Sequence, residues 1–254
     1  MKREVIYYHD ELNDEFSTAK IKAKRIDGSY RYDGTFLRRP GRLFWYYVVA
    51  KPVAATFLKT KFHHRIENRE VLPGTKEQGF FLYGNHTNQI ADALIPAIIS
   101  HPKGAYVVVH PDNVSMPLLG RITPSLGALP LPDDLDAQRN FVRSIRHHIQ
   151  QRACITIYPE AHIWPYYTKI RPFPDSSFAY PVRFHTPVYC FTNTYQRWKD
   201  SEKIQIVTYV DGPFFPDEAA AAKIQRRQLR DMVYGTMVER SGNNNIEKIH
   251  YIRQ

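Results

Sequence analysis

The amino-acid sequence predicts a single α/β domain, with a mostly parallel sheet covered by helices and an amphipathic helical region near the N-terminal end. Two observations support this fold class. From Gly79 onward, apolar runs of strand length alternate with segments of helical periodicity, a pattern typical of parallel sheets. The chain has 254 residues, 43% hydrophobic and 24% charged, so it is long enough to bury one substantial core.

Each predicted element follows from its own local pattern. Strands are expected at the short apolar runs 80–83, 105–110, 128–131, 153–158, 188–191 and 204–210. Helices are expected at 88–100, 134–152 and 217–239. The segment 134–152 carries the clearest helix signals, because it begins with acidic residues, repeats apolar residues at helical spacing and ends in basic residues.

The pattern divides the chain into a main domain, 38–240, an accessory segment, 1–37, and a C-terminal tail, 241–254. The domain opens with an apolar, aromatic-rich stretch, 43–58, which has basic residues on both sides and is too short to span a bilayer. Such a stretch suits a helix lying in a membrane interface, and it equally suits a helix packed across the sheet. Pro52 is expected to kink or break this helix.

Composition indicates which class of partner and which cellular compartment to expect. The net charge of +10 favours anionic partners, among them lipid headgroups, nucleic acids and acidic proteins. Cys154 and Cys190 lie in apolar runs and are expected to be buried, reduced thiols. With no leader peptide and no membrane-spanning stretch recognised, we expect a cytoplasmic protein.

Polar residues follow two of the predicted strands, where parallel sheets place their ligands. His86 follows the run that ends at Tyr83, and Asp92 lies a little further along the expected helix. If Asn88 caps that helix, the positive end of the helix dipole keeps the His86 ring neutral. A neutral imidazole oriented by a carboxylate is a general base, so this pattern predicts activation of a hydroxyl nucleophile. The alternative is that His86 only caps the helix and Asp92 is a surface residue.

Four blocks together resemble the lysophosphatidate acyltransferase family of glycerolipid acyltransferases. The resemblance covers roughly residues 43–212 and follows the order of the family's motifs. The blocks are Asn85-His86 with Asp92, Met116 to Arg121 with Leu126 to Pro130, Tyr158-Pro159-Glu160, and Thr186-Pro187-Val188.

Three departures from the family pattern bear on the substrate. Five residues separate His86 from Asp92, whereas the family has four, so either the turn is wider or Asp92 is replaced in its role. Ala161 and His162 follow Glu160, so the phosphate-binding arginine of the family is missing. Pro132-Asp133-Asp134 stands where the second block usually ends in an arginine. Arg121 is the first choice among the remaining cations, ahead of Lys169, Arg171 and His162.

The resemblance implies an O-acyltransferase of phospholipid biosynthesis. It would move a fatty acyl group from coenzyme A or an acidic acyl carrier protein to a hydroxyl of a lysophospholipid such as 1-acylglycerol-3-phosphate. His86 and Asp92 would be catalytic, and Asn85, Glu160 and Arg121 would bind the substrate, although Glu160 equally suits structural support. No metal and no cofactor beyond the acyl donor are expected. The partners would be the acyl donor, the lysophospholipid and the inner face of the membrane, with no nucleic acid. Two alternatives are an acceptor without phosphate and a non-catalytic basic protein that binds membranes or nucleic acid.

Overall fold

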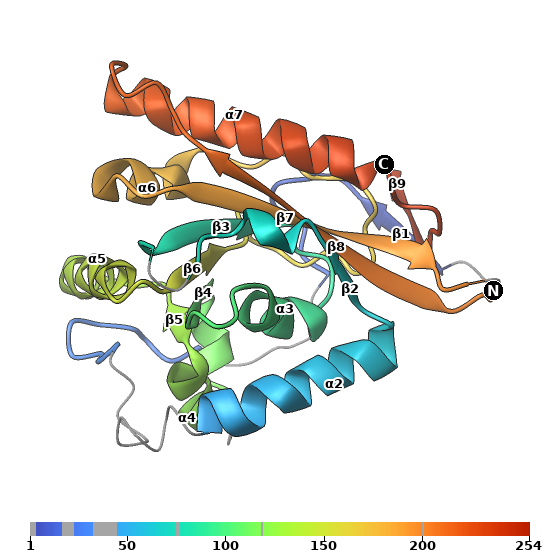
Figure 1. Cartoon of the computed structure of the whole chain (residues 1–254), viewed down its shortest axis with the longest axis horizontal. Helices are drawn as coiled ribbons and strands as arrows, with labels where there is room; N and C mark the ends of the chain where they lie inside the picture. Colours follow the sequence, from blue (N-terminus) through green and yellow to red (C-terminus); the bar gives the residue numbers. More distant parts are fainter. Residues whose placement is uncertain (1–3, 17–22, 33–44, 75–76, 118, 200) are drawn as a thin grey trace.

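The structure is a computed structural model. It describes residues 4–16, 23–32, 45–74, 77–117, 119–199 and 201–254, without the side chains of residues 45, 119 and 121. A seven-stranded sheet runs through the centre of the domain (Figure 1). Its strands, in spatial order, are β2 (Arg65–Glu67), β8 (Ile204–Phe214), β7 (Val188–Arg197), β3 (Phe80–Gly84), β6 (Cys154–Ile157), β4 (Ala105–Val109) and β5 (Ala128–Pro130). All neighbours are parallel except β7 and β8, which are antiparallel, so the predicted class is confirmed.

Helices cover both faces of this sheet (Figure 1). The α-helices packed on it are α2 (Lys51–Phe62) and α3 (Ala91–Ile99) on one face and α5 (Leu135–Gln150), α6 (Ala179–Phe184) and α7 (Ala222–Ser241) on the other. The other helices are short: η1 (Trp45–Ala50), η2 (Arg69–Val71), η3 (Pro111–Val114), α4 (Leu119–Ile122), η4 (Thr123–Leu126) and η5 (Ser176–Phe178).

Alternating side chains of the central strands supply two cores. On β3, Phe81 and Tyr83 join the core beneath α5 and α7, whereas Phe80 and Leu82 join the core beneath α2 and α3. This two-residue period is that of a strand buried on both faces. Cys154 and Cys190 are buried, free thiols, as the sequence predicts.

The apolar stretch near the N-terminal end is helical, and one of its faces packs on the domain. The π-helix η1 continues directly into α2, so Pro52 does not end the helix but lies in the first turn of α2. Leu58 and Phe62 are buried against the sheet, whereas Val48 is 56% and Val53 is 62% exposed. Packing on one side therefore coexists with exposed apolar residues on the other.

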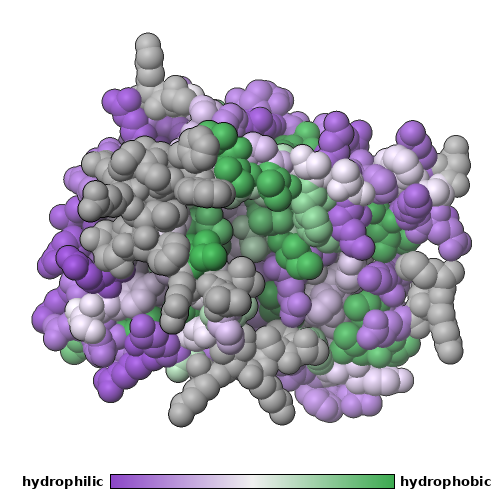
Figure 2. Space-filling view, turned by 90° about the horizontal axis from the view of Figure 1, so that it is seen from below, coloured by the Kyte–Doolittle hydropathy of each residue, from purple (hydrophilic) through white to green (hydrophobic). Residues whose placement is uncertain are grey.

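A hydrophobic patch lies near the middle of the face seen in Figure 2, the side on which α2 lies, and hydrophilic side chains border it. Among the described residues, no helix combines the length and apolar character needed to cross a bilayer.

The segments at the two ends of the sequence pair with each other. β1 (Glu4–Tyr8) and β9 (Ile249–Arg253) form a separate two-stranded parallel sheet (Figure 1). Tyr8, Phe16 and Tyr251 pack around Trp164, which belongs to the loop after β6. This loop also carries Glu160, so the accessory segment and the tail meet close to the predicted site.

Candidate active site

The site lies at the carboxyl end of β3, as expected for a parallel sheet. Gly84 ends this strand, and a Cβ atom there would lie 2.2 Å from the ring of Phe191 on β7. The glycine therefore lets β3 approach β7 closely just before the turn that carries His86. The side chain of Asn88 accepts a hydrogen bond from the N–H of Ala91 at 3.0 Å, so it caps the start of α3.

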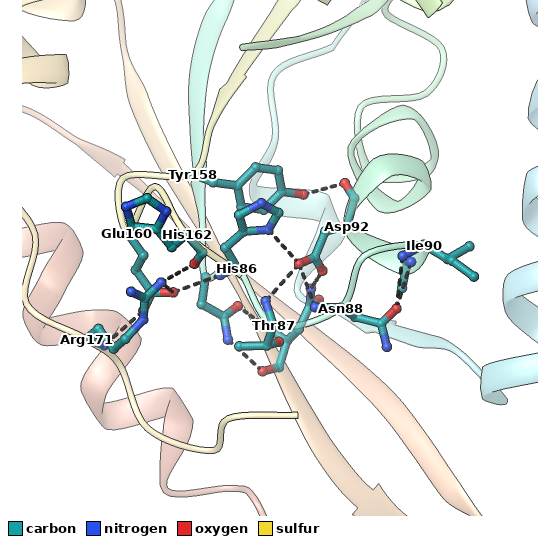
Figure 3. Close-up of polar contacts among 12 residues, drawn as sticks. His86, Thr87, Asn88, Ile90, Asp92, Tyr158, Glu160, His162 and Arg171 are labelled. Carbon is teal, nitrogen blue, oxygen red and sulfur yellow. Dashed lines mark hydrogen bonds and ion pairs between the residues drawn. The ribbon is translucent and has the colours of Figure 1, made fainter. Parts of the chain in front are cut away.

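The structure brings His86 and Asp92 together despite the extra residue between them. Nδ1 of His86 lies 2.9 Å from Oδ2 of Asp92 (Figure 3). The same oxygen accepts the backbone N–H groups of Thr87 and Asn88, both at 2.8 Å. These two bonds show how the wider turn is accommodated, because the turn folds around the carboxylate and returns it to the ring.

Asp92 is buried rather than on the surface. It is 1% exposed, and its second oxygen accepts a hydrogen bond from Nδ2 of Asn193 at 3.1 Å. A buried carboxylate needs such donors, because they replace the water that would otherwise solvate it. The sequence does not predict Asn193 as a site residue. The signal that could have done so is the run of three polar residues, 192–194, within a buried strand.

Tyr158 covers one face of the His86 ring. The two ring centroids are 4.4 Å apart, and the Tyr158 hydroxyl donates to the backbone oxygen of Asp92 at 2.5 Å. The His86 side chain remains 18% exposed. Because Nδ1 faces Asp92, Nε2 is the nitrogen that can meet a substrate, which is the arrangement a general base requires.

The Glu160 carboxylate binds the backbone of His86. It is 3% exposed, and Oε2 accepts the backbone N–H of His86 at 2.9 Å while Oε1 accepts the N–H of Arg171 at 2.9 Å (Figure 3). The Arg171 guanidinium lies 3.6 Å from Glu160, donates to the backbone oxygens of Glu11 and His162, and stacks over Trp164. Burial raises the pKa of Glu160 and lowers the pKa of Arg171, so the loss of solvation outweighs their mutual attraction.

The other predicted substrate-binding residues lie differently from the expectation. Asn85 is 1% exposed, and its amide bonds to both the N–H and the carbonyl of Asn193, so it joins β3 to β7 behind the site. Arg171 is 1% exposed and is engaged with Glu160, which removes it from the candidates for phosphate binding. Arg121 belongs to α4, but its side chain lies outside the described part of the structure. Its predicted role in substrate binding stays a prediction.

In the part of the chain that the structure describes, no three His, Cys, Asp or Glu side chains are placed to hold a metal ion. No family model matches the chain, and no curated protein gives a significant match. Among solved structures, the 1-acyl-sn-glycerophosphate (LPA) acyltransferase PlsC from Thermotoga maritima is similar. It matches with a TM-score of 0.57 and 16% sequence identity, over 84% of this chain and 87% of that one. The chain therefore shares the fold of this acyltransferase.

Proposed function

We infer that the protein is a glycerolipid acyltransferase in which His86 is the general base. The observation that carries this proposal is the contact between His86 Nδ1 and Asp92 Oδ2, 2.9 Å long, at the carboxyl end of β3. The shared fold with a lysophosphatidate acyltransferase supports it, as do the ordered sequence blocks.

In this mechanism Nε2 of His86 takes the proton from a hydroxyl of a lysophospholipid acceptor. The acceptor oxygen attacks the carbonyl carbon of an acyl thioester, and the tetrahedral intermediate collapses to the ester and a thiolate. The imidazolium returns its proton to the thiolate, which leaves as a free thiol. Asp92 fixes the tautomer of His86 and stabilises its positive charge during the transfer. The donor would be acyl-coenzyme A or an acidic acyl carrier protein, and the reaction would take place at the inner face of the membrane.

One observation favours a second acceptor class, a hydroxyl lipid without phosphate. The family's arginine is replaced in sequence by Ala161 and His162, and Arg171, the nearby buried cation, is engaged with Glu160. His162 instead lies 3.7 Å from the carboxylate of Glu15. Arg171 and His162 are thus both engaged within the protein, which suits an acceptor without a phosphate group.

A panel of acceptors tests the proposal. Purified protein is incubated with acyl-coenzyme A or acyl carrier protein and with lysophosphatidate, other lysophospholipids or monoacylglycerol, and esters are identified by mass spectrometry. Ester formation that is lost in His86→Ala supports the proposal, and the preferred acceptor decides between the two classes. No ester with any pair would favour a non-catalytic membrane-binding or nucleic-acid-binding protein.

A further inference from the structure

A chain of hydrogen bonds extends from the buried Asp92 across the sheet to the half-buried His64. Nδ2 of Asn193 donates to Oδ1 of Asp92 at 3.1 Å, and the Thr208 hydroxyl donates to Oδ1 of Asn193 at 2.6 Å. Nε2 of His64 lies 2.8 Å from the Thr208 hydroxyl. Asn193 and Thr208 are directly opposite each other on β7 and β8, and both are at most 1% exposed.

The direction of every bond in this chain is fixed by chemistry. An ionised carboxylate only accepts hydrogen bonds, so the amide nitrogen of Asn193 faces Asp92 and its oxygen faces Thr208. The Thr208 hydroxyl must then donate its hydrogen bond to Asn193, so its oxygen accepts a hydrogen bond from the Nε2–H group of His64. All three bonds therefore point towards the carboxylate that orients His86.

Asn193 also holds the turn from its other side, through its backbone. Its N–H donates to Oδ1 of Asn85 at 2.7 Å, and its carbonyl accepts from Nδ2 of Asn85 at 3.0 Å. Asn85 directly precedes His86. Asn193 therefore binds both the carboxylate of Asp92 and the residue next to His86. Among the described residues, Asn193 is the one hydrogen-bond donor to Oδ1 of Asp92, whereas Oδ2 has three hydrogen-bond partners.

We propose that Asn193, held in place by Thr208 and His64, is a positioning residue for the His86–Asp92 pair. The proposal rests on the proposed function of this site and adds a residue to it. Without its Asn193 donor, Asp92 should become a stronger acceptor for the protonated His86 ring and lose its fixed orientation. Both effects would hinder release of the proton and reduce turnover, without altering the contacts of the lipid or the thioester.

The sequence offers a matched pair of substitutions. Thr208→Val removes the hydroxyl that anchors Asn193. Thr192→Val makes the same change on the neighbouring strand, at a residue that is also 0% exposed and whose hydroxyl has no hydrogen-bond partner among the described residues. Asn193→Ala removes the donor to Asp92 itself.

Steady-state kinetics should separate these variants. Asn193→Ala and Thr208→Val are expected to lower kcat on the order of tenfold, the worth of one well-placed hydrogen bond, with little change in either KM. The acidic limb of the pH–rate profile should move to higher pH, because the His86 ring becomes easier to protonate. Thr192→Val should behave as the parent does. Parental kcat and pH profile in folded Asn193→Ala and Thr208→Val variants would overturn the proposal.

A second measurement does not depend on the reaction. NMR of the His86 ring gives the pH at which it takes up its proton, and this should rise by roughly half a pH unit or more in Asn193→Ala. The other groups facing the pair are the same in every variant: Glu160 with Arg171, Tyr158 and Tyr195. If the parent makes no ester, the proposed function fails, while an unchanged NMR midpoint would separately reject the role of Asn193.

Discussion

The ring of Tyr158 lies almost parallel to the ring of His86, inclined by 19°, while its hydroxyl holds the backbone of Asp92. Both members of the proposed catalytic pair are therefore tied to the end of β6 by one side chain. This contact restricts the rotation of the imidazole and leaves its edge for the substrate.

His86→Ala should abolish most of the activity and leave the fold intact. A lost general base costs about 10²–10⁴-fold in turnover. The matched control is His147→Ala, an exposed histidine on α5, which should keep parental turnover. Thermal unfolding followed by circular dichroism checks the fold, and near-parental turnover of folded His86→Ala would remove this residue from the mechanism.

Arg171→Met should destabilise the protein strongly. It leaves the buried Glu160 carboxylate without its cation, a change that typically costs about 3–5 kcal/mol. The control is Arg227→Met on α7, which removes an exposed ion pair with Asp231 and should cost at most about 1 kcal/mol. Urea unfolding measures both, and equal losses would show that the Glu160–Arg171 pair contributes no more than a surface pair.

Membrane association should depend on the exposed face of η1 and α2. Replacing Val48 and Val53 by aspartate is expected to lower partitioning onto anionic vesicles on the order of tenfold for each fully inserted valine. Val238→Asp on α7, which covers the opposite face of the sheet, should not change it. Vesicle sedimentation measures the bound fraction of the parent and of each variant. Binding that survives both substitutions would limit α2 to its packing role.

The half-buried His64 should make stability depend on pH. Burial lowers its pKa to about 4 in the folded state, against about 6.5 in an unfolded chain. Between these values the unfolded state binds a proton that the folded state does not, so stability is complete above pH 6.5 and falls as the pH drops towards 4. Urea unfolding of parent and His64→Gln over this range should show a smaller pH dependence in the variant; an identical slope would refute it.

Arg121 remains the first candidate for binding an acceptor phosphate. Arg121→Ala should raise the KM for lysophosphatidate about ten- to a hundredfold, the worth of a charge-assisted contact of roughly 1.5–3 kcal/mol. The KM for the acyl donor should change far less. An unchanged acceptor KM would make Arg121 a surface charge and favour an acceptor without phosphate.

The sequence predicts the buried strands and the helix 134–152 well because their signals are local. Asp134, for example, caps α5 by accepting the N–H of Ala137 at 2.8 Å. The strand β7 extends to Arg197, beyond the predicted 188–191, because its polar second half pairs with β8 and gives no apolar pattern. The short β2 and the pair β1 and β9 are also not predicted, because each pairs with a segment far away in the sequence. Pairing between distant segments decides them, not composition.

The site residues also fall into two groups, those that the sequence predicts and those that it does not. His86 and Asp92 are recognisable from their place after a strand, because the contact between them is local in sequence. The supporting residues Glu160, Asn193 and Arg171 act through bonds to segments about 10 to 110 residues away. No spacing rule reveals such bonds, and this is why Glu160 fits backbone support as well as acceptor binding until the structure shows its partners.

The cluster around Trp164 has an optical consequence. This indole is 0% exposed, stacks on Tyr251 and lies 4.9 Å from the Arg171 guanidinium. Its fluorescence emission maximum and its near-ultraviolet circular dichroism therefore depend on the packing of β1 and β9 and on the conformation of the loop that carries Glu160. With Trp45 and Trp198 replaced by phenylalanine, Trp164 becomes a fluorescent reporter through which loosening beside His86 can be followed separately from melting of the central sheet.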